Sequence, residues 1–194
     1  AKISDKGRGA ATYKALSTTP VTTVPQNYLG NTTGSLPTVS GVLGASPFYV
    51  GATNATTGGD NTIGTLKGAG MGQPIMLAAE SYLLQAEAAV RGIISGNAGD
   101  LFNKGIEASF RYLYKGANGA VAAGKDPVAD AAAYHTENPN SPIVNFALAT
   151  TEAQKIEAII TQKYIAYNNI GRHIAWADFR RTGYPRIVPN GGPT

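Results

Sequence analysis

Glu80 and Glu87 are the acidic residues whose spacing could support catalysis. They lie seven positions apart in a stretch with a helical pattern, so they share one face, about 10 Å apart from the helical rise alone. That separation is near the upper limit for an inverting glycosidase pair, which makes a glycoside hydrolase one hypothesis. The structural alternative is that Glu87 pairs with Arg91, four residues later, and that Glu80 takes an arginine from a neighbouring helix. We favour the structural interpretation.

Other catalytic and metal-binding patterns are weak in this sequence. The two histidines, His135 and His173, lie in separate segments without a ligand-type residue one helical turn away, and there is no cysteine. No G-x-S-x-G sequence supports a Ser-His-Asp hydrolase. The glycines of "GTLKGAGMG" (64–72) lack the GK[ST] ending of a phosphate-binding loop. We therefore expect no cofactor, no metal and no enzymatic activity.

Tyrosine is the residue type that most favours ligand binding. The chain has 10 tyrosines and 5 phenylalanines, and a tyrosine combines a stacking face with a hydroxyl group. Tyr28, Tyr49 and Tyr134 fall in stretches that we interpret as polar loops. They are the candidates for ligand contact, with plain packing as the alternative.

Charge is sparse and thinly spread. Charged residues make up 14% of the 194 residues, the formal net charge is +4, and the longest basic run is Arg180-Arg181. A nucleic-acid-binding surface needs a basic stripe, so nucleic acid is excluded as an expected partner. No apolar run approaches the roughly 18 residues that a membrane-spanning helix needs.

The chain divides into two regions of different composition. Residues 1–72 are rich in Gly, Thr, Ser, Asn and Pro without a sustained apolar period, which predicts long loops packed on something outside this sequence. Residues 73–194 carry the helical patterns. We expect helices over 74–92, 101–114, 151–168 and 173–181, with residues 115–148 as a loop.

Specific residues mark the expected helix ends. Pro74 suits a first helical position, Gly92 a left-handed stop, and Thr151 with Gln154 has the spacing of a capping box. Gly183 and Pro185 would end the last helix. The predicted fold is mainly α, with tetratricopeptide-like helical hairpins and long irregular loops, although no strict 34-residue period is visible.

Three segments resemble the C-terminal half of the SusD/RagB family, in its SusD-like subgroup. They are "AESYLLQAEAAVRG" (79–92), "GIEASFRYLY" (105–114) and "IEAIITQKYIAYNNIGRHIAWADFRRTGYP" (156–185). The family's hallmarks are the AEA-type helix, a helix with "TQK" and a tryptophan helix closing in RRTG(Y)P, and all occur here in order. "NYLGNTTG" (27–34) is similar to a stretch of the irregular region that precedes the AEA helix in the family.

The resemblance implies a surface lipoprotein of the outer membrane that is a binding protein and not a catalyst. Such a protein captures a nutrient, usually an oligosaccharide, and acts as a lid over a SusC-like TonB-dependent transporter, while a related branch takes peptides. The lipidated cysteine and the N-terminal helical region of the family are not in this sequence. We therefore expect a C-terminal portion of a larger protein, with the lipid anchor and the rest of the scaffold elsewhere in that protein.

The terminal tryptophan helix is expected to have a structural role. Trp176 and Phe179 are three residues apart and would anchor this helix on the bundle. Arg180 and Arg181 lie at its C-terminal end, where cations complement the helix dipole. One guanidinium group is expected to reach Glu87 or Glu80 and form a fixed clamp between the first and last helices.

Overall fold

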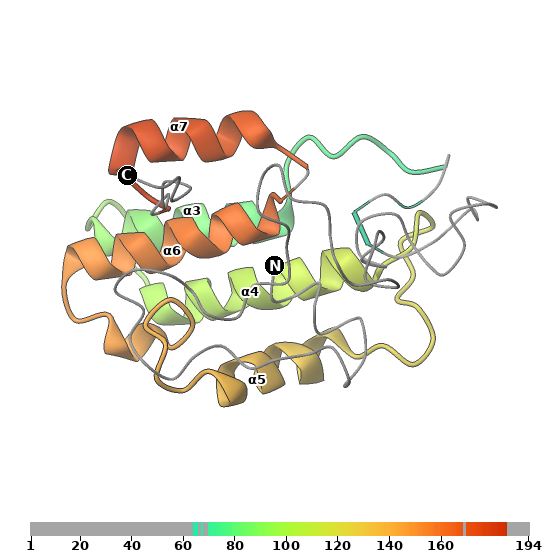
Figure 1. The fold of residues 1–194 in the computed structure, drawn as a ribbon, viewed down its shortest axis with the longest axis horizontal. Coiled ribbons are helices and arrows are strands. Elements are labelled where there is room, and N and C mark those ends of the chain that lie inside the picture. The colour runs from blue at the N-terminus through green and yellow to red at the C-terminus, as the bar shows by residue number, and fades with distance from the viewer. Residues whose placement is uncertain (1–63, 66, 68–69, 169, 186–194) are drawn as a thin grey trace, which may run out of the picture.

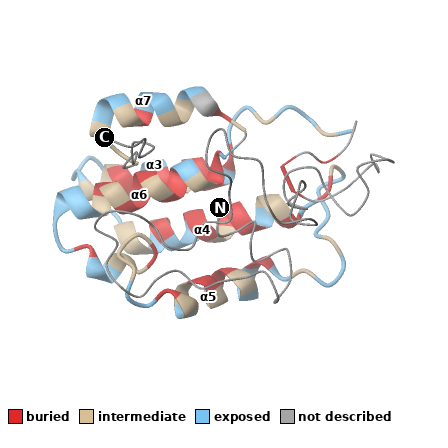
Figure 2. Cartoon of the chain, in the orientation of Figure 1, coloured by how far each residue is buried: buried red, intermediate tan, exposed pale blue. Residues whose placement is uncertain are grey.

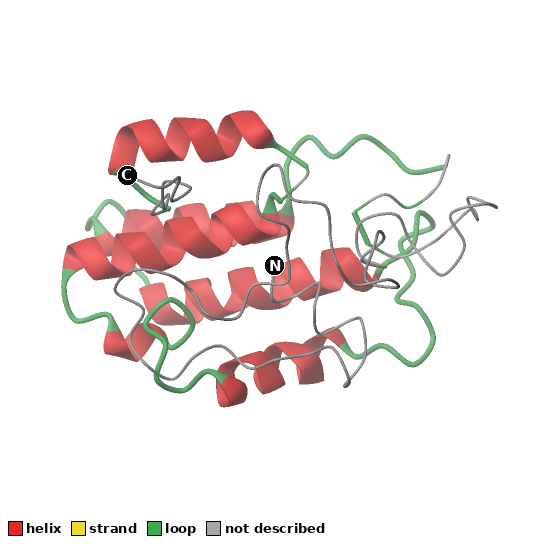
Figure 3. Cartoon of the chain, in the orientation of Figure 1, coloured by secondary structure: helices red, strands yellow, loops and turns green. Residues whose placement is uncertain are grey.

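The computed structural model describes residues 64–65, 67, 70–168 and 170–185, and within them the chain is helical (Figures 1 and 3). The only pairing of extended backbone among these residues is an isolated bridge between Lys115 and Val121. The mainly α fold is confirmed. The elements in chain order are α3 (Ala78–Val90), α4 (Ala98–Tyr114), α5 (Pro127–Glu137), the 3₁₀ helix η1 (Phe146–Leu148), α6 (Glu152–Ala166) and α7 (Arg172–Thr182).

The helices stack in layers around α4. α5 packs on one side of α4, α3 and α6 pack together on the other, and α7 lies outermost against α6 (Figure 1). A short connection joins α3 to α4, as in the expected hairpin. No helix in the described ranges is both long and apolar enough to cross a bilayer.

The core lies on the face of α4 that carries Phe102, Ile106, Phe110 and Tyr114, all at most 2% exposed (Figure 2). Their four-residue spacing produces one apolar stripe along the helix. Side chains from three other helices close around this stripe, among them Leu83, Ala86, Tyr134 and Ile159. α4 is therefore the central element, and the surrounding helices are positioned through it.

Gly105 allows the close approach of α3 and α4. A Cβ atom at this position would lie 2.6 Å from Leu83 Cγ and 2.8 Å from Leu83 Cδ2. Leu83 is 1% exposed and belongs to the buried core cluster. A larger residue at position 105 would therefore force the Leu83 side chain to shift.

The start of α3 differs from the prediction. Pro74 is not its first residue, because Leu77 is the N-cap in an extended conformation and the helix begins at Ala78. The Leu77 amide donates to the Tyr167 hydroxyl at 3.2 Å and its side chain is buried, which fixes the chain before the helix. Ile75 and Met76, which fall inside the predicted helix 74–92, precede the observed helix and are 94% and 55% exposed.

The predicted glycine stops and the capping box are confirmed, whereas α4 begins at Ala98, three residues before the predicted start at residue 101. Gly92 and Gly183 have φ values of 69° and 77°, the left-handed conformation that glycine adopts without strain. The Thr151 hydroxyl accepts from the Gln154 amide at 3.2 Å, and the Gln154 side chain accepts from the Thr151 amide at 3.1 Å. This reciprocal pair is the expected capping box.

The prediction of a loop over residues 115–148 is wrong, because α5 and η1 lie within it. Asp126 caps α5 by accepting from the amides of Val128 and Ala129 at 3.0 Å each, and Pro127 occupies its first position. The buried side chains of α5 are only Pro127, Ala131 and Tyr134, a stripe too sparse to stand out among alanines. Most of the predicted region 1–72 lies outside the described residues, so the division at residue 72 stays a prediction.

Candidate functional site

Charged side chains from three helices meet at the junction of α3, α6 and α7. Residues with alternating charge face one another there, and four of the five are buried to below 10% exposure. They are Glu80 and Glu87 of α3, Lys163 of α6, and Asp178 and Arg181 of α7. We call these five residues the charged junction.

Lys163 is the cation at the centre of this junction. Its Nζ lies 3.4 Å from Glu80 Oε1 and 3.1 Å from Asp178 Oδ2, so it links α6 to both neighbouring helices. The hydroxyl of Tyr167 also donates to Glu80. Burial and this hydrogen bond raise the pKa of Tyr167 to about 12. Tyr167 therefore acts as a hydrogen-bond donor throughout the neutral range.

Arg181 forms a bidentate ion pair with Glu87. Its Nη1 binds Glu87 Oε1, its Nη2 lies 2.8 Å from Oε2, and Nη2 also reaches Asp178 Oδ1 at 2.9 Å. Arg91 adds a third contact at 2.8 Å to Glu87 Oε1. Burial opposes the ionised form of Glu87, but the hydrogen bonds and charges of Arg181 and Arg91 outweigh it and hold the pKa below its usual 4.5.

The two glutamates are engaged in ion pairs and are poorly placed for hydrolysis. Their side chains are 12% and 7% exposed, and neither lines the cavity described below. A general acid needs a raised pKa, whereas the pKa of Glu87 is lowered. The geometry of Glu80 and Glu87 thus fits the structural interpretation. Among the described residues no cluster of His, Asp or Glu could hold a metal ion.

Trp176 and Arg180, the other two residues of the expected clamp, take no part in the contacts of the charged junction. Trp176 is 59% exposed and stacks on Phe179 at 5.9 Å, so its expected role as an anchor on the bundle is wrong. Trp176 precedes Asp178 by two positions, about 200° around a helix, and Asp178 faces the bundle. Arg180 is exposed and forms no ion pair with any described carboxylate.

Of the three tyrosine candidates for ligand contact, Tyr134 lies among the described residues. Tyr134 lies on α5 and is 2% exposed, so the prediction that it belongs to a polar loop is wrong. Its ring packs on Phe110 at 6.0 Å, and its hydroxyl accepts from Gln162 Nε2 at 3.3 Å, because the helical spacing turns it toward α4. Tyr28 and Tyr49 lie outside the described residues.

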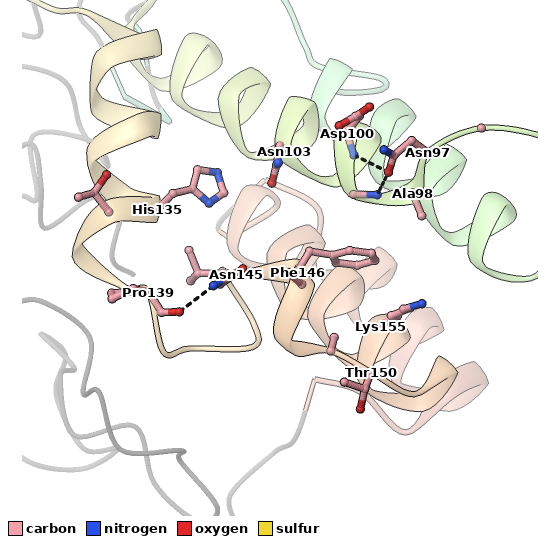
Figure 4. Close-up of a pocket in the computed structure, with 16 residues that line it drawn as sticks. Asn97, Ala98, Asp100, Asn103, His135, Pro139, Asn145, Phe146, Thr150 and Lys155 are labelled. Carbon is pink, nitrogen blue, oxygen red and sulfur yellow. Dashed lines mark hydrogen bonds between the residues drawn. The ribbon is translucent and has the colours of Figure 1, made fainter.

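A cavity of about 1030 Å³ opens between the start of α4, the end of α5, η1 and the start of α6 (Figure 4). Asn103, His135, Asn145, Phe146 and Lys155 contribute to its walls. The cavity could not be predicted from the sequence, because two of its walls come from residues 115–148, which were expected to form a loop. The available signal was Asp126-Pro127, the capping pair that starts α5.

Successive helices packed side by side in hairpins place this chain in the class of tetratricopeptide-like helical scaffolds. Residues 67–191 of this scaffold match the SusD-like family, described as "Susd and RagB outer membrane lipoprotein". The chain belongs to this family. The resemblance inferred from its AEA, TQK and RRTG(Y)P segments is confirmed.

Solved structures of SusD-like proteins are similar to this chain over part of its length. A SusD homologue from Bacteroides fragilis NCTC 9343 has 36% identity and a TM-score of 0.48, with 60% of this chain and 25% of that one covered. A Bacteroidetes SusD-like protein has 32% identity and a TM-score of 0.48, with 59% of this chain and 20% of that one covered. A chitin-binding protein has 32% identity and a TM-score of 0.44, with 60% of this chain and 22% of that one covered. This chain thus spans a quarter or less of their length, and no curated protein matches it.

Proposed function

We propose that this protein captures an oligosaccharide at the bacterial surface and delivers it to a SusC-like TonB-dependent transporter, over which it acts as a lid. The observation that carries the proposal is the family match over residues 67–191. The family description also supports attachment to the outer membrane through a lipid. In this proposal the protein binds its ligand and does not turn it over.

A peptide-capturing lid is the second candidate. The family description names RagB beside SusD, and the resemblance implies that the RagB branch takes peptides. Extended peptide backbone would be bound with little side-chain preference, whereas an oligosaccharide would be bound through ring stacking and hydroxyl contacts. The two candidates therefore predict different ligands for the same importer.

Deletion of the gene in its source bacterium tests the proposal directly. We expect slower growth on a limiting oligosaccharide and unchanged growth on the corresponding monosaccharide, because only the larger nutrient needs capture. Loss of growth on oligopeptides instead would favour the peptide lid. The genes beside the transporter gene provide a cheap control, since glycoside hydrolases accompany a glycan importer and peptidases accompany a peptide importer.

An assay for sugar hydrolysis distinguishes a binding protein from a glycoside hydrolase. We expect the purified protein to retain an oligosaccharide intact during long incubation, and Glu87→Gln to leave this result unchanged. Release of shorter sugars that disappears in Glu87→Gln would overturn the proposal in favour of a glycoside hydrolase that uses Glu80 and Glu87. Chromatography of the sugar before and after incubation is the measurement.

A further inference from the structure

The cavity beside η1 has fixed walls. The Phe146 ring packs on Phe102 at 4.8 Å, which attaches η1 to the core face of α4. Gln162 of α6 donates to the Ile143 carbonyl at 2.7 Å, and Val144 is fully buried. The segment that forms one side of the cavity is thereby tied to both α4 and α6. A site on such rigid elements loses little entropy when a ligand binds.

Polar atoms that are not engaged elsewhere face this cavity. Asn103 and His135 point toward the same space from α4 and α5 (Figure 4). Asn103 is exposed at the cavity wall, so its side-chain amide is open to a ligand. Asn145 donates its Nδ2 to the Pro139 carbonyl at 2.8 Å, which leaves its Oδ1 able to accept. His135 bonds the Val144 backbone and keeps a second ring nitrogen.

The charges around the cavity balance. Asp100 and Lys155 are the two groups that carry full charges among its lining residues. Burial lowers the pKa of His135, so its imidazole is neutral at pH 7. The formal charges of the lining therefore sum to zero. Its ligand should be neutral and rich in groups that both donate and accept hydrogen bonds.

We propose that this cavity is a binding site for one or two residues of a neutral oligosaccharide. Amide side chains donate and accept, which matches sugar hydroxyls, and the apolar surface of Phe146 and Pro139 suits the C–H face of a pyranose ring. The volume of about 1030 Å³ lies just above the range of roughly 300–1,000 Å³ for small-molecule sites, so it has room for one or two sugar residues. This inference rests on the proposed capture of an oligosaccharide and assigns a place to it.

Titration of the 194-residue chain with maltotriose, cellotriose, mannotriose and N,N′-diacetylchitobiose tests this site by two-dimensional NMR. We expect at least one of these sugars to shift the amide signals of Asn103, Asn145 and their neighbours. Asn103→Ala should weaken that binding about 10-fold, the effect of losing a well-placed pair of hydrogen bonds. Ala147→Trp, which fills the cavity without removing a contact, should abolish it.

Asn140→Ala is the matched control, because Asn140 is exposed and lies outside the cavity lining. We expect it to bind the sugar as the unaltered chain does. Sugar binding that is unchanged in both Asn103→Ala and Ala147→Trp would overturn the site and leave the proposed function standing. Failure of all four sugars to bind would overturn the site and count against sugar capture by this chain. Triglycine that shifts the same amides while the sugars do not would overturn the saccharide assignment and favour the peptide lid.

Discussion

Two neighbouring arginines of α7 have identical chemistry and different surroundings. Arg181 bridges Glu87 and Asp178, whose side chains are 7% and 8% exposed, whereas Arg180 points to solvent. Removal of one member of a buried pair leaves an uncompensated charge, at a cost of about 3–5 kcal/mol. The Arg181 side chain is 43% exposed, which lets water replace part of the contact.

We therefore expect Arg181→Met to lower the free energy of unfolding by about 2 kcal/mol. Arg180→Met should change it by less than about 0.5 kcal/mol, as at other exposed positions. Urea unfolding followed by circular dichroism measures both. Equal losses in the two variants would show that helix-end charge, and not the contact with Glu87, stabilises α7.

The lowered pKa of Glu87 predicts a pH dependence of stability. A carboxyl group whose pKa is lower in the folded than in the unfolded chain stabilises the fold above its usual 4.5, and this contribution disappears as the pH falls through the folded value. The stability difference between the unaltered chain and Glu87→Gln should be largest at pH 7 and shrink below pH 4.5. Urea unfolding at several pH values measures this difference.

Glu107→Gln is the control for this pH dependence, because Glu107 pairs with Arg111 at 2.7 Å on a half-exposed face of α4. We expect a difference of only about 0.5 kcal/mol there. A Glu87→Gln difference that stays constant from pH 7 to pH 3 would contradict a role for the ionised carboxylate. It would leave only packing of the side chain as the reason for any stability loss.

At the scale of the helices, the sequence predicted those elements whose signals are local. Capping pairs and glycine stops act within a few residues, so Thr151, Gly92 and Gly183 were interpretable without tertiary contacts. α5 was missed although Asp126-Pro127 is a local start signal, because its buried stripe consists of only Pro127, Ala131 and Tyr134. The same limit affects the cavity, whose walls come together only when α5 packs against α4.

The prediction for Trp176 failed because the sequence does not show which face of α7 points toward the bundle. Trp176 was assigned to the bundle because it lies three residues before Phe179, but the ion pair of Asp178 with Lys163 turns the opposite face of α7 inward. The contact between Arg181 and Glu87 was among those expected, since charge is sparse and the two helices must meet. A buried charge thus determined the orientation of α7 more strongly than a large apolar ring.

The packing of α3 on α4 predicts an unusual response at Gly105. In an isolated helix, Gly→Ala is stabilising by about 1 kcal/mol. Here the added Cβ would lie 2.6 Å from Leu83 Cγ, so we expect Gly105→Ala to destabilise the chain by about 1–3 kcal/mol. In a Leu83→Ala background the same substitution should be neutral or stabilising, because the obstructing atoms are gone. Additive effects in this double-mutant cycle, measured by urea unfolding, would contradict direct contact as the cause.

At the scale of the whole molecule, the candidate ligand cavity and the exposed aromatic pair lie on different layers. The cavity is bordered by α4, α5 and the start of α6, whereas Trp176 and Phe179 lie on α7, the outermost helix on the other side of the stack (Figure 1). Sugar binding at the cavity and protein binding at α7 can therefore be measured separately. Sugar would be detected at the cavity, and any protein surface that covers α7 would be detected at Trp176.

Trp176 is the single tryptophan of the chain, so its fluorescence reports on the outer face of α7 without interference. Because it is 59% exposed, we expect iodide to quench it almost as efficiently as free N-acetyltryptophanamide, and Trp176→Ala to cost less than about 1 kcal/mol of stability. Saturating sugar should leave the quenching unchanged, since the cavity is remote from α7. Strong protection from iodide in the isolated chain would contradict the exposed position of the indole. Protection that arises only when sugar is added would show that α7 and the cavity are coupled, contrary to the layered arrangement of the helices.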